Sequence, residues 1–217
     1  MLQDFSNRLD CLGTETAFLV SKDASEFASK GNKIYPFHLG DININTPFNI
    51  IEKSEIAMKE GKTGYVPSEG IPTLRDAIAD KISNERDVKL TRDNVIVQPG
   101  GKPVILKFIH CLMNPGDEVL YPNPGYPIYE SQIEYNEGIA VPYSYNSHND
   151  GFSIDQIQLE RSVNTKTKIL IYNNYQNPMG SESSKEEMKW IANFAIKNNL
   201  WVLSDEAYFN IQYSGTP

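Results

Sequence analysis

The sequence has few cysteines, no long apolar run and no targeting segment at its start, and each lack excludes a class of protein. Its two cysteines, Cys11 and Cys111, are far apart and have no Cys-x-x-Cys partner. We therefore expect reduced thiols in a cytoplasmic protein, and no metal site. No apolar run approaches the roughly 18 to 20 residues that span a bilayer. The first residues lack a basic segment followed by an apolar one, so we expect no signal peptide and no membrane partner.

An excess of basic residues is also missing. The 20 Lys and Arg residues are outnumbered by 28 Asp and Glu residues, and the formal net charge is -8. This balance argues against nucleic acid or an anionic membrane as a partner. Hydrophobic residues make up 40% and charged residues 22%, as in ordinary globular proteins, and 217 residues can bury a sizeable core.

Strand-like and helix-like segments alternate along most of the chain, with no internal repeat. The expected strands are short apolar runs at residues 95–97, within 114–122, and at 138–142, 166–173 and 200–203. The expected helices are one in the segment ending near Lys33, one from Pro72, one from Gly101, one over 126–135 and one ending near Asn198. Such alternation predicts an α/β fold with a mainly parallel sheet flanked by helices.

Side-chain patterns support three of these helices. Proline suits the first turn of the helix at Pro72, where one face is apolar: Leu74, Ala77, Ile78 and Ile82. The helix after Gly101 should turn an apolar set inward: Val104, Ile105, Phe108, Ile109 and Leu112. Ser183 and Ser184 each precede a glutamate by three residues, which is the capping-box pattern of a helix start.

Parallel sheets place ligands at the carboxyl ends of their strands, and the loops that follow four expected strands contain polar or glycine residues. Gly100-Gly101 leaves backbone N–H groups bare at a helix start, which suits a phosphate, although such a turn can be a plain connection. It is neither a P-loop nor Gly-x-Gly-x-x-Gly. Tyr126 can pack on the sheet edge or stack on a ligand.

Two further strand ends carry polar groups. Asn177-Pro178 is a candidate for a cis peptide or a rigid turn that presents an amide. Asp205 can be a helix N-cap, or a carboxylate that pairs with a cationic ligand atom. Taken together, the four loops have the groups needed to hold a phosphorylated, protonatable aromatic heterocycle.

Seven blocks of the sequence then point to one family. They are, in order, RLDCLGTETAF, GDININTP, GYVPSEGIPTLRDAIA, VQPGGKPVI, NPGDEVLYPNPGYPIYE, TKILIYNNYQNPMG and SDEAYFNIQY. In this order they resemble the class I/II aminotransferases of fold type I, the aspartate-aminotransferase-like superfamily. The resemblance implies pyridoxal 5'-phosphate as cofactor, and an amino acid and a 2-oxo acid as substrates.

The resemblance also implies roles for individual residues. Asp205 matches the aspartate that pairs with the protonated pyridine nitrogen of the cofactor. Tyr208 and Asn177 match the groups that hydrogen-bond its phenolic oxygen, and Asn177 also lies beside the substrate carboxylate. Tyr126 matches the aromatic residue stacked on the pyridine ring.

Further matches concern the phosphate, the substrate and the subunit arrangement. Gly100, Gly101 and Lys102 match the turn whose backbone amides bind the phosphate, so the Lys102 side chain need not take part. Tyr65 matches a tyrosine that reaches the phosphate of the neighbouring subunit, which implies a homodimer. Gly40 matches the glycine near the substrate carboxylate.

The chain departs from the family pattern at two places. The usual Asn-Ser-Pro-Asn-Asn-Pro-Thr-Gly turn has Tyr175, Gln176 and Met179 in place of typical residues. The Schiff-base lysine is expected beyond Pro217, so the catalytic lysine is not among these residues and the chain alone should be inactive. By this resemblance, residues 1–45 belong to a small domain and 46–217 to an incomplete large domain that binds the cofactor.

Two other functions remain open. A related fold type I enzyme, such as a β-lyase or a synthase, would share all of these motifs. A non-catalytic regulator that binds the same cofactor is the third possibility, although such regulators carry a basic DNA-binding domain, and this chain is acidic and starts within the family's own N-terminal block. An NAD-binding protein is disfavoured, because no Gly-x-Gly-x-x-Gly follows the first expected strand.

Overall fold

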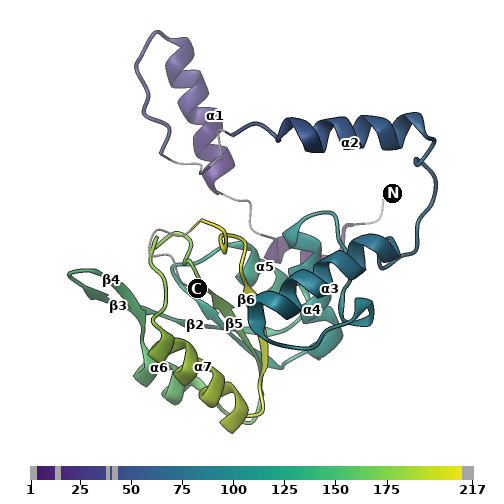
Figure 1. Cartoon of the computed structure of the whole chain (residues 1–217). Helices are drawn as coiled ribbons and strands as arrows, with labels where there is room; N and C mark the ends of the chain where they lie inside the picture. The colour runs from purple at the N-terminus through teal and green to yellow at the C-terminus, as the bar shows by residue number, and fades with distance from the viewer. Residues whose placement is uncertain (1–3, 13–15, 38–39, 41–43, 212–217) are drawn as a thin grey trace. The chain divides into compact units, whose positions relative to one another are not determined.

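Four parallel strands form the main sheet in the computed structural model, which describes residues 4–12, 16–37, 40 and 44–211 (Figure 1). The strands are β1 (Glu118–Pro122), β2 (Ile139–Tyr143), β5 (Thr167–Asn173) and β6 (Trp201–Asp205), in the order β2-β1-β5-β6. Every neighbouring pair is parallel. All four carboxyl ends therefore lie at one edge of the sheet, as the α/β prediction requires.

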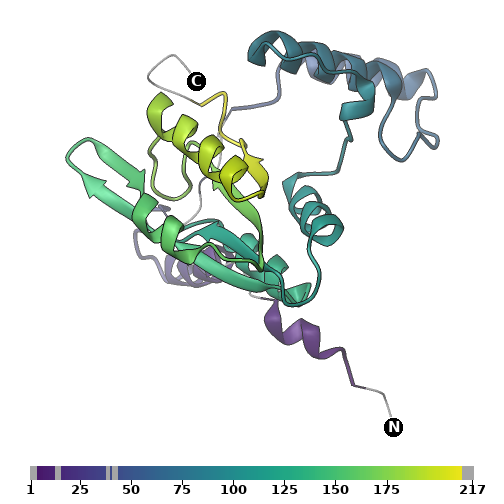
Figure 2. The ribbon, with the colours of Figure 1, turned by 90° about the horizontal axis from the view of Figure 1, so that it is seen from below.

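Helices cover both faces of this sheet (Figures 1 and 2). One face carries α4 (Gly101–Leu112) and α5 (Ile128–Tyr135), and the other carries α6 (Gln156–Ser162) and α7 (Lys185–Lys197). The predicted fold class is thereby confirmed. Helices α4, α5 and α7 lie within a few residues of their predicted bounds, whereas α6 has no counterpart in the sequence-based prediction.

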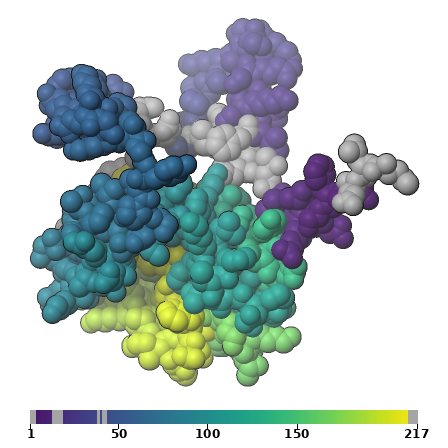
Figure 3. All heavy atoms as spheres, turned by 90° about the vertical axis from the view of Figure 1, so that its right-hand side faces the viewer, coloured from purple at the N-terminus to yellow at the C-terminus, as the bar shows by residue number. Residues whose placement is uncertain are grey.

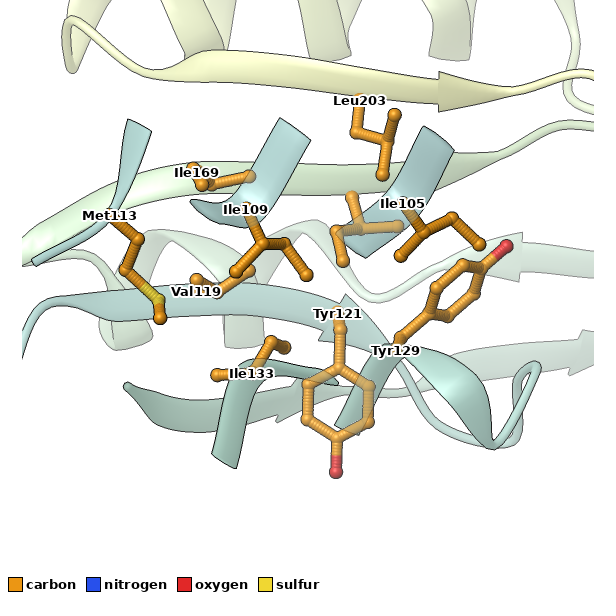
Figure 4. Close-up of a cluster of buried hydrophobic side chains, with 10 residues drawn as sticks. Ile105, Ile109, Met113, Val119, Tyr121, Tyr129, Ile133, Ile169 and Leu203 are labelled. Carbon is orange, nitrogen blue, oxygen red and sulfur yellow. The ribbon is translucent and has the colours of Figure 1, made fainter. Parts of the chain in front are cut away.

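The two central strands supply both cores because their side chains alternate between the faces. On β1, Val119 and Tyr121 belong to the cluster with α4 and α5, and Leu120 belongs to the cluster with α6 and α7. Ile169 and Leu170 of β5 divide in the same way. Figure 4 shows the first cluster, in which residues of α4 and α5 pack on these strands. A strand that is buried on both faces has a nearly continuous run of apolar residues. Such runs stand out in a sequence, which explains why these strands could be predicted.

A two-stranded antiparallel sheet was not predicted. It consists of β3 (Tyr145–His148) and β4 (Gly151–Ile154), joined by a short turn after His148. The Asn-Asp-Gly sequence that leads into β4 is a hairpin signal that the sequence analysis did not use. Most residues of this hairpin are exposed or half-buried, so it has no apolar run like those of the main sheet.

The described residues fall into two compact units. One unit contains the two sheets and includes the described residues up to Leu19 and from Gly100 onward; the other is Val20–Pro99. The 3-10 helix η1 (Asn7–Cys11) lies in the first, and α1 (Thr16–Ser29) begins there and continues into the second. The boundary predicted at residue 45 stays a prediction.

The second unit corrects two expectations. It contains α2 (Phe48–Lys59), α3 (Pro72–Arg86) and the 3-10 helix η2 (Arg92–Asn94). Helix α3 begins at Pro72 as predicted, but its expected apolar face is only partly covered: Ile78 and Ile82 are half-buried, whereas Leu74 is 42% exposed and Ala77 is exposed. The buried residues of this helix are Arg75 and Ala79. Val104 on α4, in the first unit, is likewise exposed although it was expected inward.

The strand expected at residues 95–97 is also absent from the part of the chain that the structure describes. Its backbone groups have other partners. The Val95 carbonyl accepts a hydrogen bond from Arg75 Nε at 2.9 Å, and the Val97 N–H donates to the Glu69 carbonyl at 2.9 Å. A β-strand requires a neighbouring strand to complete its ladder, and no described strand pairs with this segment.

Three further observations bear on the sequence-based expectations. No helix within the described ranges is both long and apolar enough to cross a membrane. Among those same residues, no group of three or more His, Cys, Asp or Glu side chains could hold a metal ion. Cys11 and Cys111 are both unpaired and exposed.

Candidate active site

Two strand ends bring the expected polar residues close together. Strand β5 ends at Asn173 and β6 ends at Asp205, and these two residues are register partners in the parallel ladder. The segments that follow them therefore leave the sheet side by side, one with Asn177 and the other with Tyr208. This is the edge at which the sequence predicts a ligand.

The Asp205 carboxylate accepts two hydrogen bonds within the protein. Its Oδ2 accepts from the Tyr129 hydroxyl at 2.6 Å, and its Oδ1 accepts from the Ala207 N–H at 3.2 Å. The second contact spans two residues and stabilises a turn, so Asp205 caps no helix here. The carboxylate oxygens keep further lone pairs, and the residue is half-buried rather than enclosed. Asp205 can therefore accept another hydrogen bond from a ligand.

Tyr129 was not predicted as a site residue, and its hydroxyl is held as a donor. Its side chain is 1% exposed and packs in the cluster beneath α4 and α5, where Figure 4 shows its ring next to Ile105. Burial first, and then the hydrogen bond to Asp205, raise the pKa of the Tyr129 hydroxyl far above that of a free tyrosine. The hydroxyl therefore stays protonated and donates to the carboxylate.

Tyr126 lies next to this pair. Its ring meets the Tyr129 ring edge to face, with 5.7 Å between ring centroids and an interplanar angle of 87°. It is half-buried and packs against the same cluster. Tyr126 thus contacts Tyr129, the residue that donates to Asp205. The two predicted roles of Tyr126, packing on the sheet edge and stacking on a ligand near Asp205, are therefore compatible.

Asn177 is held by its backbone. Its N–H donates to Asn173 Oδ1 at 2.8 Å, and the Asn177-Pro178 bond is cis, which confirms one of the two predicted alternatives. The loop is closed further by Asn174 Oδ1, which accepts from the Ser183 N–H at 3.0 Å and from Tyr175. The half-buried Asn177 is thus held at its own N–H by Asn173, whereas the Asn174 contacts join other residues of the loop.

The glycine turn forms the start of α4. Gly100 is the N-cap residue with φ 96°, a conformation that favours glycine, and no side chain caps the helix. A Cβ at Gly100 or Gly101 would meet no heavy atom within 4 Å, so the space beside this turn is open. Helix α4 contacts β5 and β6, and its Ile105 shares a cluster with Leu203 and Tyr129. The start of α4, which no side chain caps at Gly100, thus belongs to the same face of the sheet as Tyr129.

A cavity of about 930 Å³ opens on the other side of the strand-end loops. Asn177 and Tyr208 line it, whereas Asp205, Tyr126 and the glycine turn do not. Its remaining walls come from the β3–β4 hairpin, from the loop after β5 and from α7, and they include Phe152, Trp190 and Glu187. This cavity was not predicted, because the hairpin that borders it was missed.

The structure places most, but not all, of the predicted residues in one compact unit. Asp205, Tyr126, Asn177, Tyr208 and the start of α4 share one unit. Gly40 and Tyr65 belong to the second unit, where both are exposed. Two residues absent from the prediction, Tyr129 and Asn173, make the hydrogen bonds that connect the predicted ones. Tyr129 lies three positions after Tyr126, so helical spacing was the available signal.

The predicted start of α7 is partly confirmed. Ser184 is the N-cap and accepts from the Glu187 N–H at 3.1 Å. The Glu187 carboxylate does not complete the capping box, because Oε1 accepts from the Ile154 N–H of β4 at 2.6 Å. Ser183 is not the cap. Of the two predicted capping boxes, only the one at Ser184 marks the N-cap, and its glutamate, Glu187, hydrogen-bonds strand β4 of the hairpin instead of the helix start.

Comparison with known proteins points to one family. The family model for aminotransferase class I and II matches residues 37–216. An aspartate aminotransferase of Bacillus sp. (strain YM-2) is 31% identical over 215 residues, which is 99% of this chain and 55% of that protein.

Solved structures agree in fold. An alanine aminotransferase from Pyrococcus furiosus has a TM-score of 0.89 at 29% identity, covering 94% of this chain and 52% of its own. A tetra mutant of Thermus thermophilus aspartate aminotransferase, complexed with tryptophan, has a TM-score of 0.92 at 28% identity, covering 99% and 56%. The chain thus spans about half the length of these proteins.

Proposed function

The chain belongs to the class I and II aminotransferase family, and on that premise we propose that it contributes the cofactor site of an enzyme that moves an amino group between an amino acid and a 2-oxo acid. The observation that carries the proposal is the Asp205 carboxylate at the end of β6, hydrogen-bonded to Tyr129, whose ring contacts the Tyr126 ring. A carboxylate held in this way suits a cationic ring nitrogen.

The residues at the strand ends fit pyridoxal phosphate, the cofactor on which this family generally depends. The open, uncapped start of α4 at Gly100 and Gly101 suits its phosphate through backbone N–H groups and the helix dipole. Lys102 starts the same helix, and its backbone N–H is the contact we propose. Asp205 suits the ring nitrogen, and Tyr126 offers a ring face for stacking.

Each side chain has a defined task in the proposed reaction. When bound, the cofactor supplies a protonated ring that accepts the electrons released as the substrate Cα–H bond breaks. Asp205 accepts the hydrogen bond of the ring nitrogen and so keeps that nitrogen protonated. Asn177 and Tyr208 donate hydrogen bonds to the phenolic oxygen, and Asn177 also contacts the substrate carboxylate.

The remaining expectations concern residues other than those at the strand ends, and the location of the protein. We propose that Gly40 lies near the substrate carboxylate and that Tyr65 reaches the phosphate of a second copy, which makes the enzyme a homodimer. The lysine that holds the cofactor stays a prediction beyond Pro217. Cytoplasmic location also stays a prediction.

The test replaces Asp205 by Ala in the protein expressed at its full encoded length. The variant should lose amino-group transfer by at least about 100-fold, because the ring nitrogen loses its counter-charge. Asp117→Ala is the matched control: Asp117 is also half-buried and accepts one backbone hydrogen bond, but it lies at the opposite edge of the sheet. Near-normal transfer by Asp205→Ala would refute the assignment. Elimination with release of free ammonia, or condensation products, without transfer of the amino group to an added 2-oxo acid would instead favour the β-lyase or synthase alternative.

A further inference from the structure

One buried amide joins the two residues that the proposed function places at the ring nitrogen and at the phenolic oxygen of the cofactor. Asn173 is 3% exposed at the end of β5. Its Nδ2 donates to the Asp205 carbonyl at 3.0 Å, and its Oδ1 accepts from the Asn177 N–H at 2.8 Å. The opposite amide orientation would set oxygen against oxygen and N–H against N–H, so the two contacts determine which way the side chain lies.

This amide lies where the ladder between β5 and β6 ends. Asn173 and Asp205 are the last register partners, and beyond them the two chains separate into different loops. Beyond the last ladder pair, the Asn173 side chain links the two chains, because it hydrogen-bonds both the Asp205 carbonyl and the Asn177 N–H. The spacing between these two residues is therefore set by one side chain rather than by the ladder.

We propose that Asn173 is a positioning residue of the cofactor site, which fixes the spacing between the Asp205 carboxylate and the Asn177 amide. The proposal rests on the proposed function, because only a ligand that contacts both residues makes their spacing matter. A site of this kind must hold its groups within about 0.5 Å of the productive arrangement. Losing the amide frees the loop that carries Asn177 relative to the end of β6.

The competing explanation is that Asn173 merely satisfies buried backbone groups. Its neighbour Asn174 does that and is the natural control. Asn174 is 8% exposed; its Oδ1 accepts the backbone N–H groups of Tyr175 and Ser183, and its Nδ2 lies 3.9 Å from Met188 Sδ. These hydrogen bonds reach neither Asp205 nor Asn177. The two asparagines are adjacent, similarly buried and similarly bonded, and they differ in what they connect.

The experiment compares Asn173→Ala with Asn174→Ala in the protein expressed at its full encoded length. The measurements are the dissociation constant for pyridoxal phosphate, the pH titration of the bound cofactor's absorbance, and the thermal midpoint without cofactor. Both variants should lower the midpoint by similar amounts, since each loses two hydrogen bonds to backbone. Only Asn173→Ala should weaken cofactor binding by about tenfold or more and shift the absorbance titration.

A second substitution guards against misfolding. Asn173→Asp keeps an acceptor for the Asn177 N–H but sets a carboxylate oxygen against the Asp205 carbonyl, so it should weaken binding at least as much as Ala does. Equal effects of the Asn173 and Asn174 variants on binding and absorbance, with normal binding by the wild type, would overturn this inference alone. Failure of the wild type to bind the cofactor would overturn the proposed function, and this inference with it.

Discussion

Replacing Tyr129 by Phe removes one hydroxyl and leaves the ring in place. In the native protein that hydroxyl donates to Asp205 Oδ2 at 2.6 Å and is buried with the rest of the side chain. Hydrogen bonds to charged groups contribute about 1.5–3 kcal/mol to stability. Because Asp205 is only half-buried, water can replace part of the lost contact. We therefore expect the free energy of unfolding to fall by about 1–2 kcal/mol.

A double-mutant cycle isolates this contact. Unfolding by urea is measured for the wild type, Tyr129→Phe, Asp205→Ala and the double variant, and the coupling energy should be about 1–2 kcal/mol. The control cycle pairs Asp205→Ala with Tyr143→Phe. Tyr143 is fully buried and donates to the Ile171 carbonyl at 2.9 Å, in the other cluster. That control cycle should be additive within about 0.5 kcal/mol.

The pH dependence of the coupling follows from the raised pKa of Tyr129. A group whose pKa is raised on folding contributes its stability fully below its unfolded pKa, which for tyrosine is about 10. That contribution is lost as the pH rises through the folded value. The coupling between Tyr129 and Asp205 should thus be constant from about pH 7 to 9. A coupling near zero in that range would refute the hydrogen bond as the element that orients Asp205.

Two other predictions test the structure itself. Gly100→Ala should lower the free energy of unfolding by about 1–2 kcal/mol, because φ 96° strains an L residue although its Cβ would meet no atom within 4 Å. Gly101→Ala, in the first turn of the same helix, should be neutral or stabilising, and equal losses from both would contradict this account. In alkaline titration, burial raises the pKa of Tyr172 to about 12 and that of Tyr143 well above its ordinary value. Their contribution is present below about pH 10 and is lost as pH rises, so these hydroxyls should ionise together with unfolding, measured by tyrosinate absorbance and circular dichroism. Full ionisation of all tyrosines in a still-folded protein would contradict their burial.

Much of the main sheet was predictable because its strands are buried on both faces. β1 contains the apolar run Val119–Pro122 and β5 the apolar run Ile169–Tyr172, and no polar residue interrupts either run. The β3–β4 hairpin is mostly polar and half-exposed, so the same criterion missed it. Residues 95–97 have the apolar composition of a strand but no described neighbour to pair with, and composition cannot report pairing.

The site divides in a similar way. Asp205, Asn177 and the glycine turn directly follow or precede an expected element, so their place at the strand ends could be predicted from the order of the elements. Tyr129 and Asn173 could not, because their importance depends on contacts between residues 76 and 32 positions apart. Those contacts arise from the order and register of the strands, and neither can be derived from the sequence alone.

The last strand shows how the sheet meets the surface. Trp201 and Val202 of β6 are exposed, and Figure 3 shows yellow C-terminal atoms on the face that it presents. At the centre of the sheet, in contrast, β1 and β5 are covered on both sides. The two faces of the sheet therefore differ little in polarity along these central strands.

That double coverage bears on which genetic changes this region tolerates. Because successive residues of β1 serve opposite cores, deleting one codon between Val119 and Tyr121 would move every later side chain of the strand to the other face. The large Tyr121 would then compete for the space of Leu120, and the loop with Tyr126 would be drawn one residue toward the sheet. A substitution at any one of these positions disturbs a single neighbourhood. In-frame deletions in the central strands should thus be far rarer among functional variants than substitutions, whereas the turn between β3 and β4 should accept changes in length.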